Sequence, residues 1–384
     1  MFHLFTGLIA LYVIWRLVWR MRWPRAAKWI VAALVLLASK HHLITSTFFG
    51  TMASPEVPYG VLLVLGWAFG ALLIAASLVL IADLAALGAR ILKQHHTRRQ
   101  LVSPAVRGGI GIVAMVLAAI GVAEAVRVPD VRTVEVEVAG LPAQLDGFRL
   151  LQLTDLHASR LAERPWIEAV VQKANAAQAD MIVITGDLVD GTVSARKNDV
   201  APLADLKAPL GVYAIPGNHE YYQQYSQWLS EFERLGLHVL KNEHTTITRG
   251  DASFILAGTT DAVAQRFNQT LPDIDAALAG VPPEAPIILM AHRPLGAEKH
   301  ARAGVDLQLS GHTHGGQVLG MHWVTQIAND GYVSGMYDVD GMKLYVSNGT
   351  GLWPGFPVRL GKRSEITEFI LRAPKAGAVT HTGR

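Results

Sequence analysis

The chain has 384 residues and no cysteine, which excludes disulfide scaffolds, cysteine-ligated zinc and thiol catalysis. Its charge is divided unevenly, because residues 1–128 hold 12 Lys and Arg against 3 Asp and Glu, whereas residues 129–384 hold 22 against 28. The resulting net charges of +9 and −6 indicate two unlike parts, and the acidic second part argues against a nucleic-acid substrate bound through its phosphates.

Long apolar segments occupy the first part of the chain. Phe2–Trp19, Tyr59–Leu87 and Gly108–Val126 are each long enough to cross a hydrocarbon layer of about 30 Å. A further segment, Ala27–Phe49, has an apolar first half and then carries Lys40, His41 and His42, so it is either a fourth span or a re-entrant segment. Because no small-residue cleavage site follows the first segment, we interpret it as a retained helix. Residues 1–128 are therefore expected to form a transmembrane anchor of about four helices.

Basic residues predict the orientation of this anchor. They gather after the first and third spans, at Arg20, Arg22, Arg25, Lys28, Arg90, Lys93, Arg98, Arg99 and Arg107, and are absent from the loop at 51–58. Such basic loops remain in the cytoplasm. With four spans, everything after Val126 then lies outside the cytoplasm, and a re-entrant second segment would reverse this placement. We expect a multi-pass protein of the bacterial cytoplasmic (inner) membrane, with residues 129–372 on its extracytoplasmic side.

From residue 129 the pattern changes to strands and helices of a water-soluble domain. Strands are predicted at Val131–Val138, Phe148–Leu153, Met181–Ile184 and Gly211–Ile215, with helices at Ala162–Ala177, Asp199–Leu206 and Gln223–Leu235. The second half is richer in strands, at Leu237–Leu240, Thr245–Thr248, Ser253–Ala257, Ile287–Met290, Val305–Leu309 and Glu365–Leu371, with a short helix at Ile274–Ala279. This order predicts an α/β sandwich in which a parallel sheet packs on a second, mixed sheet. Residues 373–384 are expected to be a disordered tail.

Side chains suited to binding metals follow nearly every one of these strands. They are Asp155, His157, Asp187, Asn218, His219, His292, His312 and His314. Strand-end loops of an α/β sheet gather at one edge, so these side chains should meet. Two Asp, one Asn and four His match the number of ligands needed by two divalent metals that share one bridging carboxylate.

Each of these residues also has an ordinary structural explanation. Asp155 or Asp187 could cap a helix, Asn218 could hold a left-handed turn, and a single strand-end histidine is often only solvated. Five strand-end loops that all present metal-suitable side chains favour the metal site. Nitrogen and oxygen ligands without thiolate suit Mn²⁺, Fe or Zn²⁺ better than Mg²⁺.

The motifs resemble those of the calcineurin-like metallophosphoesterases, especially their membrane-associated bacterial branch. Thr-Asp-Leu-His, Gly-Asp, Gly-Asn-His-Glu-Tyr-Tyr, a single His and Gly-His-Thr-His-Gly-Gly-Gln occur here in the family's order. The resemblance implies a four-layer α/β/β/α sandwich. It also implies that Asp155, His157, Asp187 and His314 hold one metal, while Asp187, Asn218, His292 and His312 hold the second. His219 would bind no metal, and would contact the phosphoryl oxygens or protonate the leaving group.

These inferences predict a dinuclear-metal-dependent phosphoesterase that hydrolyses a phosphomonoester, phosphodiester or pyrophosphate by attack of a metal-bridged hydroxide. The membrane anchor favours a lipid-linked or cell-envelope substrate. The alternatives are a nuclease of the same superfamily, and a membrane sensor or transport-associated protein with a non-catalytic phosphoesterase-like domain. No feature of the sequence indicates the oligomeric state.

Overall fold

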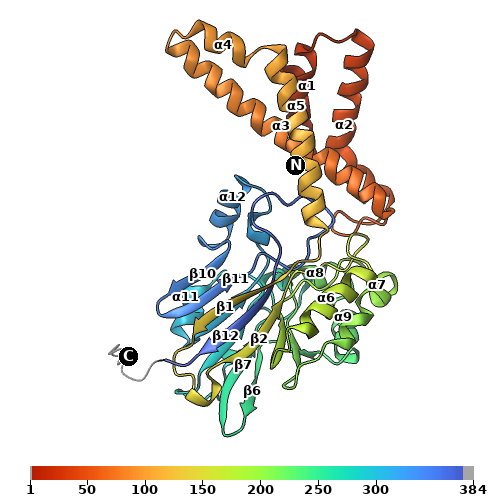
Figure 1. Cartoon of the computed structure of the whole chain (residues 1–384). Coiled ribbons are helices and arrows are strands. Elements are labelled where there is room, and N and C mark those ends of the chain that lie inside the picture. The colour runs from red at the N-terminus through yellow and green to blue at the C-terminus, as the bar shows by residue number, and fades with distance from the viewer. Residues whose placement is uncertain (1, 375–384) are drawn as a thin grey trace. The chain divides into compact units, whose positions relative to one another are not determined.

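The computed structural model describes residues 2–374, and these divide into two compact units (Figure 1). The first unit contains residues 2–127 together with residues 354–360. The second contains residues 128–353 and 361–374. The grouping of residues 354–360 with the first unit was not expected from the sequence.

Helices make up the first unit. Its elements are α1 (Phe2–Arg16) with a following 3₁₀ turn (Val18–Arg20), α2 (Arg25–Phe48), α3 (Tyr59–Ile91), α4 (His95–Leu101) and α5 (Pro104–Ala125). Among residues 2–374, four helical segments, containing α1, α2, α3 and α5, are long and apolar enough to cross a membrane. The segment that carries Lys40, His41 and His42 lies within one continuous helix, which favours a fourth span over a re-entrant segment. The short α4 was not predicted, because its polar sequence has no apolar period.

Residues 354–360 pack closely on α3 and α5 within the first unit. A Cβ added at Gly70 would lie 2.7 Å from Cγ2 of Val358, and one added at Gly121 would lie 2.6 Å from Cγ1 of the same valine. The backbone N–H of Arg359 donates to the carbonyl oxygen of Gly121 over 2.9 Å. The helices therefore provide glycine surfaces against which this loop fits.

Two six-stranded sheets form the centre of the second unit. The first has the order β1 (Val131–Glu137), β12 (Ile366–Arg372), β2 (Phe148–Leu153), β3 (Met181–Ile184), β4 (Val212–Ala214) and β5 (His238–Val239). The second has the order β10 (Gly335–Val339), β11 (Met342–Val346), β9 (Leu307–Ser310), β8 (Ile287–Met290), β7 (Ala252–Gly258) and β6 (Glu243–Arg249). Strands β2 to β5 are parallel, as are β7, β8, β9 and β11, so their carboxyl ends point the same way within each sheet.

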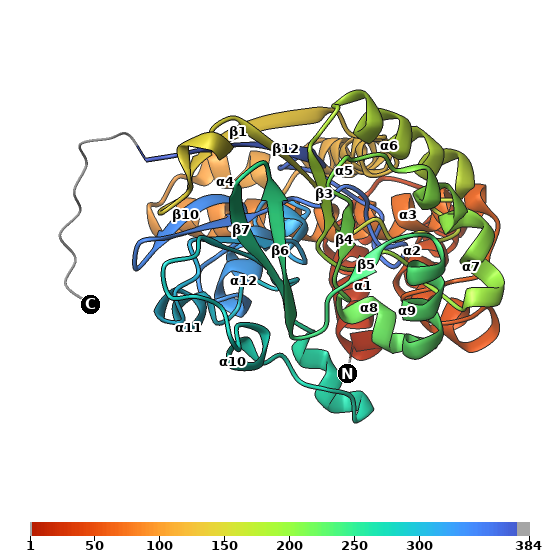
Figure 2. The ribbon, with the colours of Figure 1, turned by 90° about the horizontal axis from the view of Figure 1, so that it is seen from below.

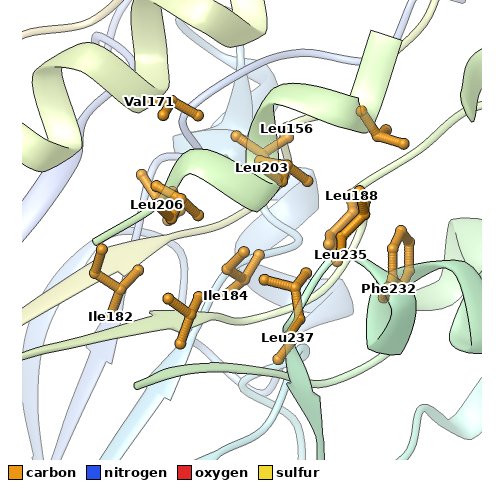
Figure 3. Packing of buried hydrophobic residues seen from close by; sticks show 14 of the residues in the cluster. Leu156, Val171, Ile182, Ile184, Leu188, Leu203, Leu206, Phe232, Leu235 and Leu237 are labelled. Atoms are coloured by element: carbon orange, nitrogen blue, oxygen red, sulfur yellow. The ribbon is translucent and has the colours of Figure 1, made fainter. Parts of the chain in front are cut away.

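Helices cover the outer face of each sheet (Figure 2). The first sheet is covered by α6 (Arg164–Ala176), α7 (Val193–Val200) and α9 (Tyr225–Arg234), and the second by α10 (Ile274–Ala277) and α11 (Ala297–Arg302). Strand β3 shows how the layers form. Ile182 and Ile184 belong to the core cluster beneath the helices (Figure 3), whereas Met181 and Val183 belong to the core cluster between the sheets. The expected four-layer α/β/β/α sandwich is confirmed.

Several local predictions differ from the structure. The prediction of a helix at Asp199–Leu206 is wrong. An α-helix spans Val193–Val200 instead, and a 3₁₀ turn follows at Ala201–Asp205. Thr192 caps the start of this helix, and Pro202 has no N–H with which to continue it. Short helices α8 (Asn218–Tyr222) and α12 (Met321–Ala328) were not predicted. Further 3₁₀ turns lie at Ala143–Leu145, Ala262–Phe267 and His314–Gly316. Of the expected tail, residues 375–384 lie outside the described part of the chain.

Candidate metal centre

The loops that follow β2, β3, β4, β8 and β9 bring the expected ligands together at the carboxyl ends of the strands. Within residues 2–374, three groups of donor atoms could each hold a metal ion, with the atoms of a group no more than 4.8 Å apart. The groups are Asp155, His157 and His314, then His157, Asp187 and His219, then Asp187, His292 and His312. The eighth expected residue, Asn218, places Oδ1 3.2 Å from Nε2 of His292.

Asp187 lies between the two halves of this cluster. Its Oδ2 is 3.7 Å from Nε2 of His157 and 3.2 Å from Nε2 of His292. On the His157 side, Nε2 of His314 lies 3.2 Å from Nε2 of His157 and 3.6 Å from Oδ1 of Asp155. Asp187 is thus the carboxylate that both halves of the cluster can share.

The backbone at five of the expected ligands is left-handed. The φ angles are 54° at Asp155, 48° at His157, 54° at Asp187, 69° at His312 and 49° at His314. Residues other than glycine adopt this region rarely, at a cost of about 1–3 kcal/mol each, and such residues concentrate at functional sites. These loops therefore adopt an unfavourable backbone conformation that directs the side chains of the candidate ligands toward the cluster.

The hydrogen bonds of the histidines test whether cations fit this cluster. Nδ1 of His292 lies 2.8 Å from the carbonyl oxygen of Thr185, which can only accept, so Nδ1 carries a hydrogen. In the neutral ring, Nε2 then directs a lone pair toward Oδ2 of Asp187 and Oδ1 of Asn218, each 3.2 Å away. Nitrogen and oxygen lone pairs that face one another without a hydrogen between them need a positive charge. A divalent cation supplies it, so the donor set fits a metal.

Burial makes the need for positive charge stronger. Burial raises the pKa of Asp155, and the neighbouring Asp187 adds to this effect against the opposing influence of His292. Burial also acts to raise the pKa of Asp187, but the imidazoles of His292 and His219 outweigh it and hold this pKa well below its usual range. Although burial opposes it, the carboxylate of Asp187 raises the pKa of His292 to about 10. The cluster without metal therefore draws a proton to the place that a cation would occupy.

Asp190 orients two of the histidines and was not identified from the sequence. Its Oδ2 lies 3.1 Å from Nδ1 of His157, and its Oδ1 hydrogen-bonds Nδ1 of His219. Both imidazoles therefore keep Nε2 directed at the centre. The only signal in the sequence was an acidic residue three positions after Asp187 in the same loop.

Glu220 is a second buried carboxylate whose role emerges only from the structure. It accepts hydrogen bonds from the backbone N–H groups of Asp187, Leu188 and Val189, at 3.1, 2.7 and 3.2 Å, and from that of Gly217 at 2.7 Å. Burial and the nearby Asp187 carboxylate raise its pKa to about 7. Glu220 thus ties the loop after β3 to the loop after β4.

Close backbone packing explains two of the motif glycines. A Cβ at Gly217 would lie 2.2 Å from Oδ1 of Asp187, and one at Gly311 would lie 2.3 Å from Oδ2 of Asp155. Any side chain at these positions would displace a candidate ligand. The Gly-Asn-His and Gly-His-x-His motifs therefore require glycine for space.

His219 and His312 are on the accessible side of the cluster. Both are partly exposed, whereas Asp155, His157, Asp187, Asn218, His292 and His314 are buried. Around His219, the ring of Tyr222 lies 4.9 Å away and that of Trp353 lies 6.5 Å away, measured between centroids. A substrate that reaches the cluster from this side would meet His219 and His312 before the buried residues.

The loop after β11 forms hydrogen bonds with the backbone of the loop that carries Asp155. The N–H groups of Thr350 and Gly351 donate to the carbonyl oxygens of Thr154 and Asp155 over 2.8 and 2.9 Å. A Cβ at Gly349 would lie 2.9 Å from Nδ1 of His314. This glycine-rich segment therefore holds the backbone that presents Asp155.

Comparison with known proteins places the soluble unit in one family. Residues 148–316 match the calcineurin-like phosphoesterase family. The chain is 37% identical over 289 residues to a bovine (Bos taurus) transmembrane protein with a metallophosphoesterase domain, covering 72% of this chain and 64% of that protein. It is 31% identical over 239 residues to the uncharacterized metallophosphoesterase YkuE of Bacillus subtilis, covering 61% of this chain and 82% of that protein.

Among solved structures, a dimetal phosphatase from Danio rerio is similar at 14% identity and a TM-score of 0.35, covering 53% of this chain and 88% of that chain. Of the curated relatives, several are matched over only 60% to 65% of their own length.

Proposed function

The chain belongs to the calcineurin-like phosphoesterase family, and we propose that it is a membrane-embedded hydrolase of phosphoric esters that depends on two divalent metals. The single observation that carries the proposal is the position of Asp187, whose Oδ2 lies 3.7 Å from Nε2 of His157 and 3.2 Å from Nε2 of His292. A carboxylate shared between two sets of nitrogen and oxygen ligands is what a dinuclear centre requires.

We assign each ligand to one half of the centre. Asp155, His157 and His314 would hold the first metal, and Asn218, His292 and His312 would hold the second. Asp187 would contribute its carboxylate to both. Nitrogen and oxygen donors without thiolate favour Mn²⁺, Fe or Zn²⁺.

The bound metals would supply a water of lowered pKa and positive charge against the phosphoryl oxygens. The chain supplies position and a proton. Asp190 stabilises the charged form of the His219 imidazole through Nδ1, which leaves Nε2 with a proton to donate to the leaving oxygen. His219 fits this role because it lies on the accessible side of the cluster.

Hydrolysis of an aryl phosphodiester by the full chain in detergent tests the proposal. Activity should appear with Mn²⁺ and disappear when a chelator removes the metal. Asp187→Asn should lower kcat by about 10²-fold or more, because it weakens both metals at once. Asp251→Asn, which changes an exposed carboxylate in a turn, is the matched control and should leave kcat unchanged.

Full activity of Asp187→Asn would refute the dinuclear assignment. If no metal supports any hydrolysis by the wild-type chain, a sensor with a non-catalytic domain becomes the better interpretation.

A substrate at the membrane surface is supported by α12. No residue of this helix is buried, and Trp323, Val324 and Ile327 are 64%, 69% and 84% exposed. The helix packs directly on the turn that carries His314, since a Cβ at Gly316 would lie 2.5 Å from Cα of His322. In a chain with four candidate spans, lipid is the apolar phase available to such a helix. We therefore favour lipid-linked phosphoesters or pyrophosphates as substrates.

Comparing a phosphoric ester that has a long acyl chain with a water-soluble one tests this preference. The variant Trp323→Ser/Ile327→Ser should raise KM for a long-chain phosphoric ester in mixed micelles by about tenfold, because it removes apolar contact area. KM for a water-soluble aryl ester should stay unchanged. Thr325→Ser/Gln326→Ser is the control on the less exposed side of the helix. Equal effects on both substrates would refute the lipid preference while leaving the hydrolase intact.

A further inference from the structure

The helical first unit contains a cavity of about 240 Å³, lined by residues between Arg16 and Arg107. At about 30 Å³ for each water molecule, it has room for about eight waters, or for a phosphate group with some of its hydration. Its lining comes from the end of α1, the end of α3, α4 and the start of α5. The charged residues of this lining, here named the arginine cavity, are Arg16, Arg20, Asp83, Arg90, Arg98 and Arg107.

Asp83 is shared by several of its neighbours. Arg16 donates to both of its carboxylate oxygens, from Nε over 2.6 Å and from Nη2 over 2.5 Å. The buried Arg107 also donates to Asp83, and Tyr12 donates its hydroxyl to Oδ2 over 2.8 Å. One carboxylate thus faces two guanidinium groups, and its hydrogen-bonding capacity is largely used.

The remaining three arginines have no such partner. Within residues 2–374, no carboxylate forms an ion pair with Arg20, Arg90 or Arg98. Five arginines against one aspartate leave the lining with a net charge of +4. Arg20, Arg90 and Arg98 are exposed, so their charges are accessible to an anion from solution, and like charges gathered around one cavity repel each other. An anion inside the cavity would relieve this repulsion.

Arginine favours a particular class of anion. Its planar guanidinium presents paired N–H donors that match phosphate oxygens, and it is less strongly hydrated than an ammonium group. Basic pockets between membrane helices are a known way to bind phosphorylated lipid head groups. Because the cavity lies where the basic loops meet the candidate spans, the phosphates of a bilayer surface are close at hand.

We propose that the arginine cavity is a binding site for a phosphate-bearing anion, separate from the metal centre. A phospholipid head group and free phosphate share this chemistry. The proposal does not depend on hydrolytic activity.

Two matched pairs of arginines allow a sharp test. Arg20 and Arg98 line the cavity, whereas Arg22 and Arg99 lie in the same two basic segments and do not line it. Arg20→Gln/Arg98→Gln and Arg22→Gln/Arg99→Gln therefore remove the same charge from the same segments. The full chain in detergent is titrated with phosphatidic acid, with phosphatidylcholine and with inorganic phosphate, and the midpoint of thermal unfolding and the lipid retained in native mass spectrometry are measured.

Phosphatidic acid should raise the midpoint of the wild-type chain and of Arg22→Gln/Arg99→Gln. Arg20→Gln/Arg98→Gln should need at least about tenfold more lipid for the same shift. An equal shift with inorganic phosphate would support the site with a soluble anion as its source. The proposal would be overturned if both double variants lost the midpoint shift by phosphatidic acid to the same extent. It would also be overturned if phosphatidic acid raised the wild-type midpoint no more than phosphatidylcholine does. Should Arg20→Gln/Arg98→Gln fail to fold, Arg90→Gln with Lys93→Gln as control applies the same test.

Discussion

The single residue Asp190 orients two imidazole rings through its carboxylate. Its carboxylate accepts from Nδ1 of His157, a candidate ligand, and from Nδ1 of His219, a candidate acid. Both contacts orient a ring without contacting substrate, so Asp190 is a positioning residue. Its effect on His219 should be visible in the chemistry of the leaving group.

Asp190→Asn should lower kcat by about 10- to 100-fold, because an amide keeps the size of the side chain but loses the charge that stabilises the His219 imidazolium. The loss should be larger for an alkyl ester, whose leaving oxygen needs a proton, than for a nitrophenyl ester, whose leaving group does not. Steady-state kinetics with both esters check this, with the exposed Asp205→Asn as control. Equal losses on both esters would mean that Asp190 acts only through His157.

Sequence motifs predicted the residues that meet at this centre but not how they are held. All seven candidate ligands and His219 lie in one cluster, because the strands that precede them are parallel within each sheet and the loops at their carboxyl ends meet there. The roles of Asp190 and Glu220 depend on which atoms face which after folding. No spacing along the chain indicates that one carboxylate will accept four backbone hydrogen bonds from two different loops.

At the scale of elements, local periodicity predicted the apolar helices and buried strands well, whereas elements that depend on distant partners were missed. Helix α12 has its apolar side exposed, and α4 is almost entirely polar, so neither shows the pattern of a buried stripe. Residues 354–360 are irregular, and their packing on α3 and α5 involves glycines more than 230 positions earlier in the chain. Hydropathy cannot detect a partner of this kind.

The fit of this loop predicts different effects of two glycine substitutions in α5. Gly121→Ala places a methyl group against Val358 and Leu360, at 2.6 and 3.0 Å, and should destabilise the chain by about 1–3 kcal/mol. Gly109→Ala has nothing within 4 Å of the added Cβ, and should be neutral or stabilising by up to about 1 kcal/mol. Unfolding midpoints in detergent measure the difference.

Val358→Ala provides the second half of this test. It removes the γ-methyl groups that the new Cβ of Gly121→Ala would meet, so the double variant should be less destabilised than the two single effects added together. Strict additivity would contradict the close contact between α5 and this loop.

Over the whole molecule, the uneven distribution of charge predicts how the chain is oriented in a membrane. Basic residues follow α1 and α3, where Arg20 and Arg98 line the arginine cavity, and the loop at 51–58 between α2 and α3 has none. If all four candidate spans cross the membrane, the excess of Lys and Arg predicts that these basic ends lie on the cytoplasmic side and the phosphoesterase unit on the opposite side. A phosphate bound in the arginine cavity and a phosphoester at the metal centre would then be drawn from different sides of the membrane.

Because the chain has no cysteine, single introduced cysteines can report this placement without background. Thr51→Cys in the loop before α3, Ala143→Cys in the phosphoesterase unit and Gln100→Cys in α4 all replace exposed residues. In intact bacterial cells, a membrane-impermeant maleimide should label Thr51→Cys and Ala143→Cys, while Gln100→Cys should react only after permeabilisation. Labelling of Gln100→Cys with protection of Ala143→Cys would invert the placement. Labelling of Thr51→Cys with protection of Ala143→Cys would show an odd number of crossings between them, and would mean that either α3 or α5 does not span.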